Sequence, residues 1–136
     1  MAEPPARLSG VESRRGALTG LHILVVEDNE GALEILRAVL EYSGALVTTA
    51  TRAAEGMRCL REATPDAVLI DFRLPDHNGT WLVREGRTIP YDGPFIAVSA
   101  LDFDGRLEDH GFDAFVRKPV DHDRLVDAVL AAIKRR

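Results

Sequence analysis

The fold is decided by the run Ala67-Val68-Leu69-Ile70-Asp71, in which four apolar residues in succession end at a carboxylate. Two further runs are similar: residues 21–26 end at the acid pair Glu27-Asp28, and residues 114–117 end at Lys118. Strands that are apolar at successive positions are typical of parallel strands covered by helices on both faces. Parallel strands point the same way, so residues at equivalent ends meet at one edge, where open α/β sheets bind ligands. The sequence therefore predicts that three acids and one ammonium group share a site.

Strands and helices alternate around these runs. Helical spacing of apolar residues predicts helices after Asn29, Thr51 and Asp121, and each of these residues is of a type that caps helices. A further helix is expected around residues 80–87. Residues 102–111 contain two glycines and four acids, so only a short or irregular helix is expected there. The expected strands, which complete an α/β fold of five strand–helix units, are residues 21–26, 45–48, 67–70, 95–98 and 114–117.

The composition is that of one globular domain. The 136 residues are 46% hydrophobic and 29% charged, which is ordinary for such a domain. The chain is too short for a second domain with a core of its own. Residues 1–20 contain prolines, glycines and scattered charges without a sustained period. We therefore expect a flexible tail over residues 1–20 and one domain over residues 21–136.

Charge and cysteine content exclude several classes of partner. The net charge is −5, and residues 1–20 carry +1, which leaves −6 on the rest and argues against nucleic acid. The single cysteine, Cys59, excludes an internal disulfide and fits a reducing compartment. No apolar run approaches the roughly 18 residues of a membrane helix. The first residues also lack the apolar stretch of a signal peptide. A cytoplasmic protein without a membrane partner is expected.

The three acids are candidate metal ligands. Carboxylates held close together repel, so at neutral pH such a cluster holds a proton or recruits a cation. Mg²⁺ suits it, because this hard ion takes oxygen ligands and keeps several waters, and Mn²⁺ is expected to substitute. We expect Asp28 and Asp71 to bind the metal directly, Glu27 to bind directly or through water, and the backbone carbonyl of Arg73 to add another oxygen. The alternative is that Glu27 and Asp28 only begin a loop and favour the positive end of the next helix.

Lys118, Ser99 and Ala100 are candidate phosphoryl-binding residues. Ser99 ends the run at residues 95–98, and the small side chain of Ala100 leaves its backbone N–H accessible. A hydroxyl, an N–H, an ammonium and a metal can together hold the three oxygens of a phosphoryl group. For Lys118 alone, a structural ion pair is the default alternative. Pro119 fixes where the chain turns after Lys118, although the sequence leaves open whether this bond is cis.

These motifs resemble the receiver domain of two-component response regulators. The pieces that match, in this order and spacing, are Glu27-Asp28, residues 71–79, Ser99-Ala100 and residues 115–119, and the resemblance covers about residues 21–136. It implies a doubly wound, flavodoxin-like parallel sheet in the order 2-1-3-4-5. It also implies Mg²⁺-dependent phosphorylation of Asp71 by a histidine kinase or a histidine phosphotransfer protein. Within the matching motifs, Pro75, Gly79 and Pro119 are expected to set loop geometry.

The resemblance assigns Ser99 and Phe115 to a coupled switch. The Ser99 hydroxyl would move toward the phosphoryl group, and the Phe115 ring would turn inward behind it. A plain core aromatic is the alternative for Phe115, since aromatic residues in strands usually just pack. The family's usual methionine is Leu74 here, a change of similar volume. Lys118 follows Ser99 by 19 positions, fewer than is usual, and the missing residues fall at 102–111, which puts the usual output surface in doubt.

The predicted function is that of a stand-alone receiver that acts through protein–protein interaction or a phosphorelay. Its kinase and its downstream partner are not identified by the sequence. The main alternative is a degenerate receiver that binds partners without being phosphorylated. An enzyme is not expected, because aspartate-nucleophile phosphatases place a second acid two residues after the nucleophile and Arg73 stands there. This arginine is instead placed where it can shield a phosphoryl group from water, or simply reach solvent.

Overall fold

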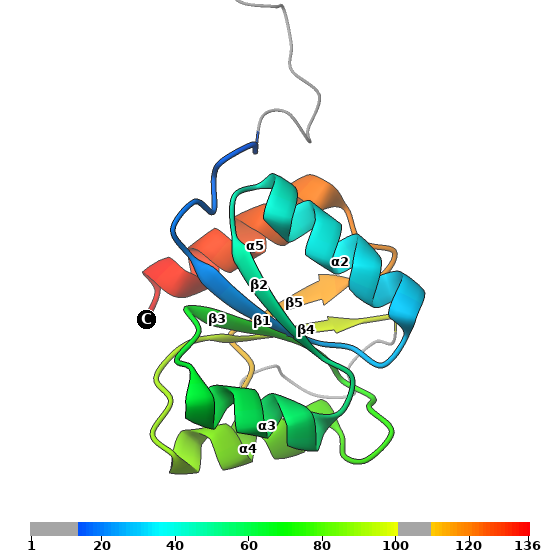
Figure 1. Cartoon of the computed structure of the whole chain (residues 1–136), viewed down its shortest axis with the longest axis vertical. Coiled ribbons are helices and arrows are strands. Elements are labelled where there is room, and N and C mark those ends of the chain that lie inside the picture. The colour runs from blue at the N-terminus through cyan, green and yellow to red at the C-terminus, as the bar shows by residue number, and fades with distance from the viewer. Residues whose placement is uncertain (1–13, 101–109) are drawn as a thin grey trace, which may run out of the picture.

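The computed structural model describes residues 14–100 and 110–136, and in this part five parallel strands form one sheet in the order β2-β1-β3-β4-β5 (Figure 1). The predicted strand order is therefore confirmed. Asp71, the last residue of β3, pairs with Val98 of β4, and Ser99 pairs with Arg117 of β5. This register brings the carboxyl ends of the central strands to one edge. The strands are β1 (His22–Val26), β2 (Leu46–Ala50), β3 (Ala67–Asp71), β4 (Phe95–Ser99) and β5 (Ala114–Arg117).

Helices cover both faces of the sheet. In Figure 1, α2 (Glu30–Tyr42) and α5 (His122–Lys134) lie on one face, and α3 (Ala53–Glu62) and α4 (Gly79–Thr88) lie on the other. Alternate strand residues supply the two cores: Leu69 packs in the α2/α5 core, whereas Val68 and Ile70 pack in the α3/α4 core. Both layers exclude water from the central strands, as the unbroken apolar runs predicted.

Three of the four described helices are capped by the residue that precedes them. Asn29 accepts from the N–H of Ala32 and caps α2, and Asp121 accepts from the N–H of Arg124 and caps α5, as predicted. Asn78 caps α4, which begins at Gly79. The prediction for α3 is wrong. Its N-cap is Arg52, which makes no side-chain cap hydrogen bond, and Thr51 does not cap the helix.

Residues 14–20 are part of the domain, so the tail expected over residues 1–20 does not extend through residue 20. Leu18 is fully buried in the α2/α5 core. Its N–H donates to the Ser43 carbonyl at 2.7 Å. Gly44 has φ +104°, and a Cβ there would lie 3.0 Å from the Cα of Thr19. Arg14 also pairs with Asp127 of α5 at 2.8 Å. The predicted boundary is therefore too late, because Leu18 gives one apolar residue and no periodic pattern.

The irregular helix expected at residues 102–111 lies almost wholly outside the described residues, so it stays a prediction. The described chain resumes at His110, whose ring contacts Phe72 edge-on at 5.7 Å. None of the helices within residues 14–100 and 110–136 is long and apolar enough to cross a membrane.

Candidate functional site

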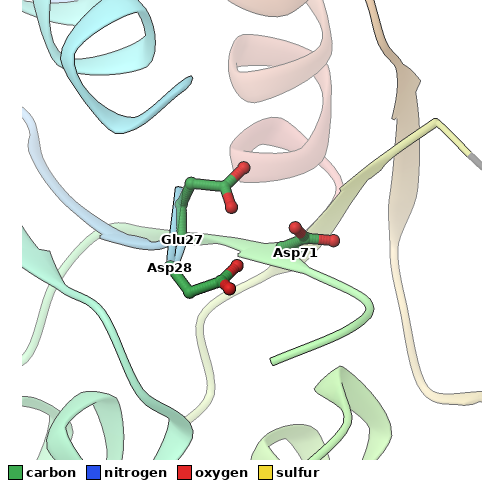
Figure 2. A group of neighbouring side chains, drawn as sticks. All are labelled: Glu27, Asp28 and Asp71. Carbon is green, nitrogen blue, oxygen red and sulfur yellow. The ribbon is translucent and has the colours of Figure 1, made fainter. Parts of the chain in front are cut away.

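Three carboxylates meet at the ends of β1 and β3. Glu27 and Asp28 directly follow β1, and Asp71 is the last residue of β3 (Figure 2). Each of the three offers one oxygen that lies within 4.8 Å of the oxygens of the other two. Glu27 is buried, Asp71 is half-buried and Asp28 is exposed. The structure thus brings together the three acids that the sequence predicted to share a site.

Lys118 reaches this cluster from the end of β5. Its Nζ donates a short hydrogen bond to Glu27 Oε1 and lies 3.4 Å from Asp71 Oδ2. Its backbone N–H donates to the carbonyl of Ser99 at 3.0 Å, which ties the ends of β4 and β5 together. The bond from Lys118 to Pro119, left open by the sequence, is cis. The ammonium therefore lies between two of the three acids.

The electrostatics of this group follow from its burial. Burial raises the pKa of the Glu27 carboxyl, and Asp71 raises it further, while the hydrogen bond from Lys118 opposes both. For Lys118, burial by itself lowers the pKa of the ammonium. The hydrogen bond to Glu27 and the charge of Asp71 outweigh that effect and leave the pKa raised. Lys118 is therefore a firmly charged cation beside three acids, and the four groups carry a formal charge of −2 when all are ionised.

A pocket of about 180 Å³ opens beside Asp71. Its lining residues are Asp71, Arg73, Ser99, Ala100 and Lys118. Ser99 is 3% exposed, and it ends β4 as predicted. The pocket thus gathers a carboxylate, a hydroxyl-bearing residue and two cationic residues. The three residues that the sequence proposed for phosphoryl binding, Ser99, Ala100 and Lys118, all line it.

Phe115 lies one strand further out. It is half-buried on β5, pairs with Ala97 and packs against the α3/α4 core. It also lines a second pocket, of about 480 Å³, with Arg117, Pro119 and Arg124. The structure therefore places Phe115 behind the end of β4, beside the site but not in it.

The loop from Asp71 to Gly79 is held at several points. The Arg73 N–H donates to Asp71 Oδ1 at 3.2 Å, and Arg73 forms an isolated antiparallel bridge with Asn78. The Gly79 N–H donates to the Phe72 carbonyl at 2.7 Å, and a Cβ at Gly79 would lie 3.2 Å from the Asp71 carbonyl oxygen. Gly79 thus permits the close approach that folds the loop back. Pro75 lies exposed within this loop.

Sequence reasoning missed the role of Asp76 in this loop. Its two carboxylate oxygens accept from the N–H groups of Ala53 and Ala54, both at 2.9 Å, at the start of α3. Asp76 therefore supplies the cap that α3 lacks locally. The two donors, Ala53 and Ala54, precede Asp76 in the chain by 23 and 22 residues, so no local pattern signals this contact. His77 and Trp81 were also not predicted to interact, and their rings stack at 3.8 Å.

The three carboxylates fit a divalent cation. Mg²⁺ binds oxygens at about 2.0–2.1 Å, so oxygens of two ligands on one ion lie roughly 3–4 Å apart. Oxygens within 4.8 Å of one another need only small side-chain adjustments to reach that spacing. The exposure of Asp28 leaves room for the waters that Mg²⁺ retains. The oxygen-only donor set likewise suits a hard cation.

Comparison with known proteins gives a family. The sequence model of the response regulator receiver domain matches residues 23–130. Over 111 residues the chain is 39% identical to the sensor histidine kinase AtsR of Burkholderia thailandensis. The aligned region covers 77% of this chain and 18% of that protein. It is 33% identical to an uncharacterized 14.6 kDa protein of Leptolyngbya boryana, covering 82% of this chain and 89% of that protein. Against several relatives named as transcriptional regulatory proteins, the chain spans 26% to 52% of their length.

Solved structures agree with the sequence match. The receiver domain of the sensor histidine kinase PA1611 from Pseudomonas aeruginosa PAO1 superposes with a TM-score of 0.79 at 29% identity, over 85% of this chain and 99% of that chain. That structure has a magnesium ion coordinated in its active-site cleft. A receiver domain protein from Methanospirillum hungatei JF-1 gives a TM-score of 0.78 at 25% identity, over 85% and 94%. The chain thus belongs to the response regulator receiver domain family of two-component signalling, a family of signalling switches rather than substrate-turnover enzymes.

Proposed function

We propose that this protein is a phosphorylation-controlled switch that accepts a phosphoryl group on Asp71. The observation that carries the proposal is the convergence of Glu27, Asp28, Asp71 and Lys118 beside the pocket that contains Ser99. An Asp71 oxygen attacks the phosphorus of a phosphohistidine on a histidine kinase or phosphotransfer protein. The P–O bond forms as the P–N bond breaks, and the imidazole keeps the electron pair. Hydrolysis of the resulting acyl phosphate releases inorganic phosphate and restores the Asp71 carboxylate.

The acid cluster would hold Mg²⁺, with Mn²⁺ as a substitute. Asp28 and Asp71 offer oxygens toward a common point, and the Arg73 carbonyl is the proposed third protein ligand. Glu27 is engaged by Lys118, so it acts on the metal through a water. When bound, Mg²⁺ supplies positive charge that stabilises the phosphoryl oxygens during transfer.

The pocket residues hold the transferred group. The Lys118 ammonium binds one phosphoryl oxygen, and the Ser99 hydroxyl and the Ala100 N–H bind others. Movement of Ser99 toward the phosphoryl group then draws Phe115 inward, which changes the surface near β5. Output through that surface would be protein–protein interaction or onward phosphotransfer.

Labelling by a small phosphodonor tests the proposal. Acetyl phosphate with Mg²⁺ should add one phosphoryl group to the wild-type protein, measured by intact mass, and the same mixture with EDTA should add none. A protein that resists labelling with Mg²⁺ present would instead be the degenerate receiver, a phosphorylation-independent interaction module. The readout therefore separates the two functions.

Loss of Asp28 should weaken Mg²⁺ binding more than loss of Glu27 does. Asp28→Ala removes a direct ligand oxygen, and we expect the affinity measured by calorimetry to fall by at least about tenfold. Glu27→Ala should cost less, because the Glu27 carboxylate is held by Lys118. Asp92→Ala is the control for removal of one negative charge, since Asp92 is exposed before β4, at the opposite edge of the sheet. Unchanged affinity in Asp28→Ala would contradict the ligand assignment.

An apolar groove beside the site supports a protein as the phosphodonor. It measures about 210 Å³, adjoins the site through Lys118, and lies between α2 and the turn after β5. Ile35 stands in its lining with 59% of its surface exposed, which is large for an isoleucine. The lining residues are Ala32, Ile35, Leu36, Lys118, Pro119 and Val120. An apolar side chain of a docked donor would find cover here while its phosphohistidine faces Asp71.

Ile35→Glu should separate the two kinds of donor. Transfer from an autophosphorylated histidine kinase, selected by its transfer to the wild type, should slow by about tenfold because a charge blocks the apolar contact. Labelling by acetyl phosphate should be unchanged, because Ile35 does not contact the reacting groups. Leu46→Glu is the matched control, since Leu46 is 69% exposed and lies outside the groove. Equal transfer to Ile35→Glu and wild type would exclude the groove as the docking surface.

A further inference from the structure

The first turn of α3 depends on a side chain from the phosphoacceptor loop. The N–H groups at the start of a helix have no partner within the helix. At α3, the Thr51 N–H donates to Glu55 Oε1 at 2.9 Å, but Arg52 caps nothing with its side chain. The N–H groups of Ala53 and Ala54 donate to Asp76 Oδ1 and Oδ2, each at 2.9 Å. One carboxylate therefore satisfies two neighbouring donors of α3.

Asp76 is held as a carboxylate at this position. Its Oδ1 also accepts from the N–H of His77 at 3.0 Å. Burial by itself would raise its pKa, but the hydrogen bonds from Ala54, Ala53 and His77 outweigh this and leave the pKa below its usual range. The negative charge also lies at the positive end of α3. The contact is thus strong in the form present at neutral pH.

A short, stiff connection joins Asp76 to the metal-binding end of the loop. The Arg73 N–H donates to Asp71 Oδ1 at 3.2 Å, and the Arg73 carbonyl is the proposed metal ligand. Only Leu74 and Pro75 separate Arg73 from Asp76. The ring of Pro75 fixes its own φ, and it also restricts Leu74 before it. An orientation imposed on Arg73 is therefore carried to Asp76, and the reverse holds too.

We infer that Asp76 is a positioning residue that couples metal binding at Asp71 to the first turn of α3, an inference that rests on the proposed function of that site. Mg²⁺ orders the loop at Arg73, which makes the Asp76 cap more persistent. The cap in turn orders the loop before the metal binds, so the loop loses less conformational entropy on metal binding. The coupling is reciprocal, so each event favours the other by the same factor. Through Asp76, α3 reports the state of the phosphoacceptor loop.

Amide hydrogen exchange and Mg²⁺ titration test the inference together. In the wild type, Mg²⁺ should slow exchange of the Ala53 and Ala54 amides by about fivefold. In Asp76→Ala these amides should exchange fast with and without Mg²⁺, and the Mg²⁺ affinity measured by calorimetry should fall by about the same factor. Asp76→Asn keeps one acceptor oxygen and should give an intermediate affinity. A purely structural cap would lower thermal stability and leave the Mg²⁺ affinity unchanged.

Asp121→Ala is the matched control. It removes the aspartate cap of α5, where Asp121 accepts from the Arg124 N–H at 3.0 Å, without touching the phosphoacceptor loop. Its Mg²⁺ affinity should equal that of the wild type. Failure of the wild type to bind Mg²⁺ would contradict the proposed metal site itself. Two outcomes would overturn the inference and leave the proposed metal site intact. In one, the wild type binds Mg²⁺ without any change in exchange at Ala53 and Ala54; in the other, both Asp76 variants bind Mg²⁺ with the affinity of the wild type.

Discussion

Asp71→Asn is expected to abolish labelling by acetyl phosphate, so that its intact mass stays unchanged where the wild type gains one phosphoryl group. The reason is chemical: an amide oxygen is a poor nucleophile toward phosphorus, whereas the Asp71 carboxylate forms the acyl phosphate directly. Asn has nearly the same size and shape, and its introduction removes one of three clustered carboxylates. The fold should therefore persist, which circular dichroism would verify. This is the largest functional effect we expect from any single substitution.

The position of the adduct is controlled by a second variant. Asp92→Asn removes an equivalent carboxyl group at an exposed position before β4, at the edge of the sheet opposite the site, and it should be labelled as well as the wild type. If Asp71→Asn gains the same adduct as the wild type, the phosphoacceptor is another residue. If no protein is labelled, the receiver acts without phosphorylation.

The largest effect on stability is expected from Leu18→Ala, which should lower the free energy of unfolding by about 2–5 kcal/mol. Leu18 is fully buried in the α2/α5 core, although it precedes the first strand by several residues. Truncation removes buried apolar surface and leaves a cavity that the packed core only partly closes. Such a loss is a large fraction of the roughly 5–15 kcal/mol that keeps a domain folded. Urea unfolding followed by circular dichroism would measure it.

Leu46→Ala is the control for the same substitution at the surface. Leu46 is 69% exposed on β2, so its truncation should change the free energy of unfolding by no more than about 0.5 kcal/mol. Arg14→Ala should lower the free energy of unfolding far less than Leu18→Ala, because the ion pair of Arg14 with Asp127 is open to solvent. A Leu18→Ala variant as stable as Leu46→Ala would show that residues 14–20 are not needed by the domain.

The layered sheet and the acids at its edge were predictable from the amino-acid sequence. A strand that is buried on both faces is apolar at successive positions, as residues 67–70 are, and such a run can be recognised in the sequence without knowledge of its tertiary contacts. A carboxylate at the end of such a run lies at the edge where parallel strands end. For this reason Asp28 and Asp71 could be predicted to share a site. The order 2-1-3-4-5 came from the family resemblance of the motifs, and the structure confirms it.

Contacts between segments far apart in the chain were visible only in the folded protein. Leu18 looked like part of a tail because one apolar residue has no period, and its burial depends on the turn at Ser43 and Gly44. Thr51 was predicted to cap α3, but Asp76 from the phosphoacceptor loop supplies both acceptor oxygens. Local sequence patterns indicate which face of a helix or strand is apolar. A capping residue from a distant loop is brought to the helix only when the elements pack together. The physical reason is that side-chain preferences act over a few residues, and packing selects partners at any separation.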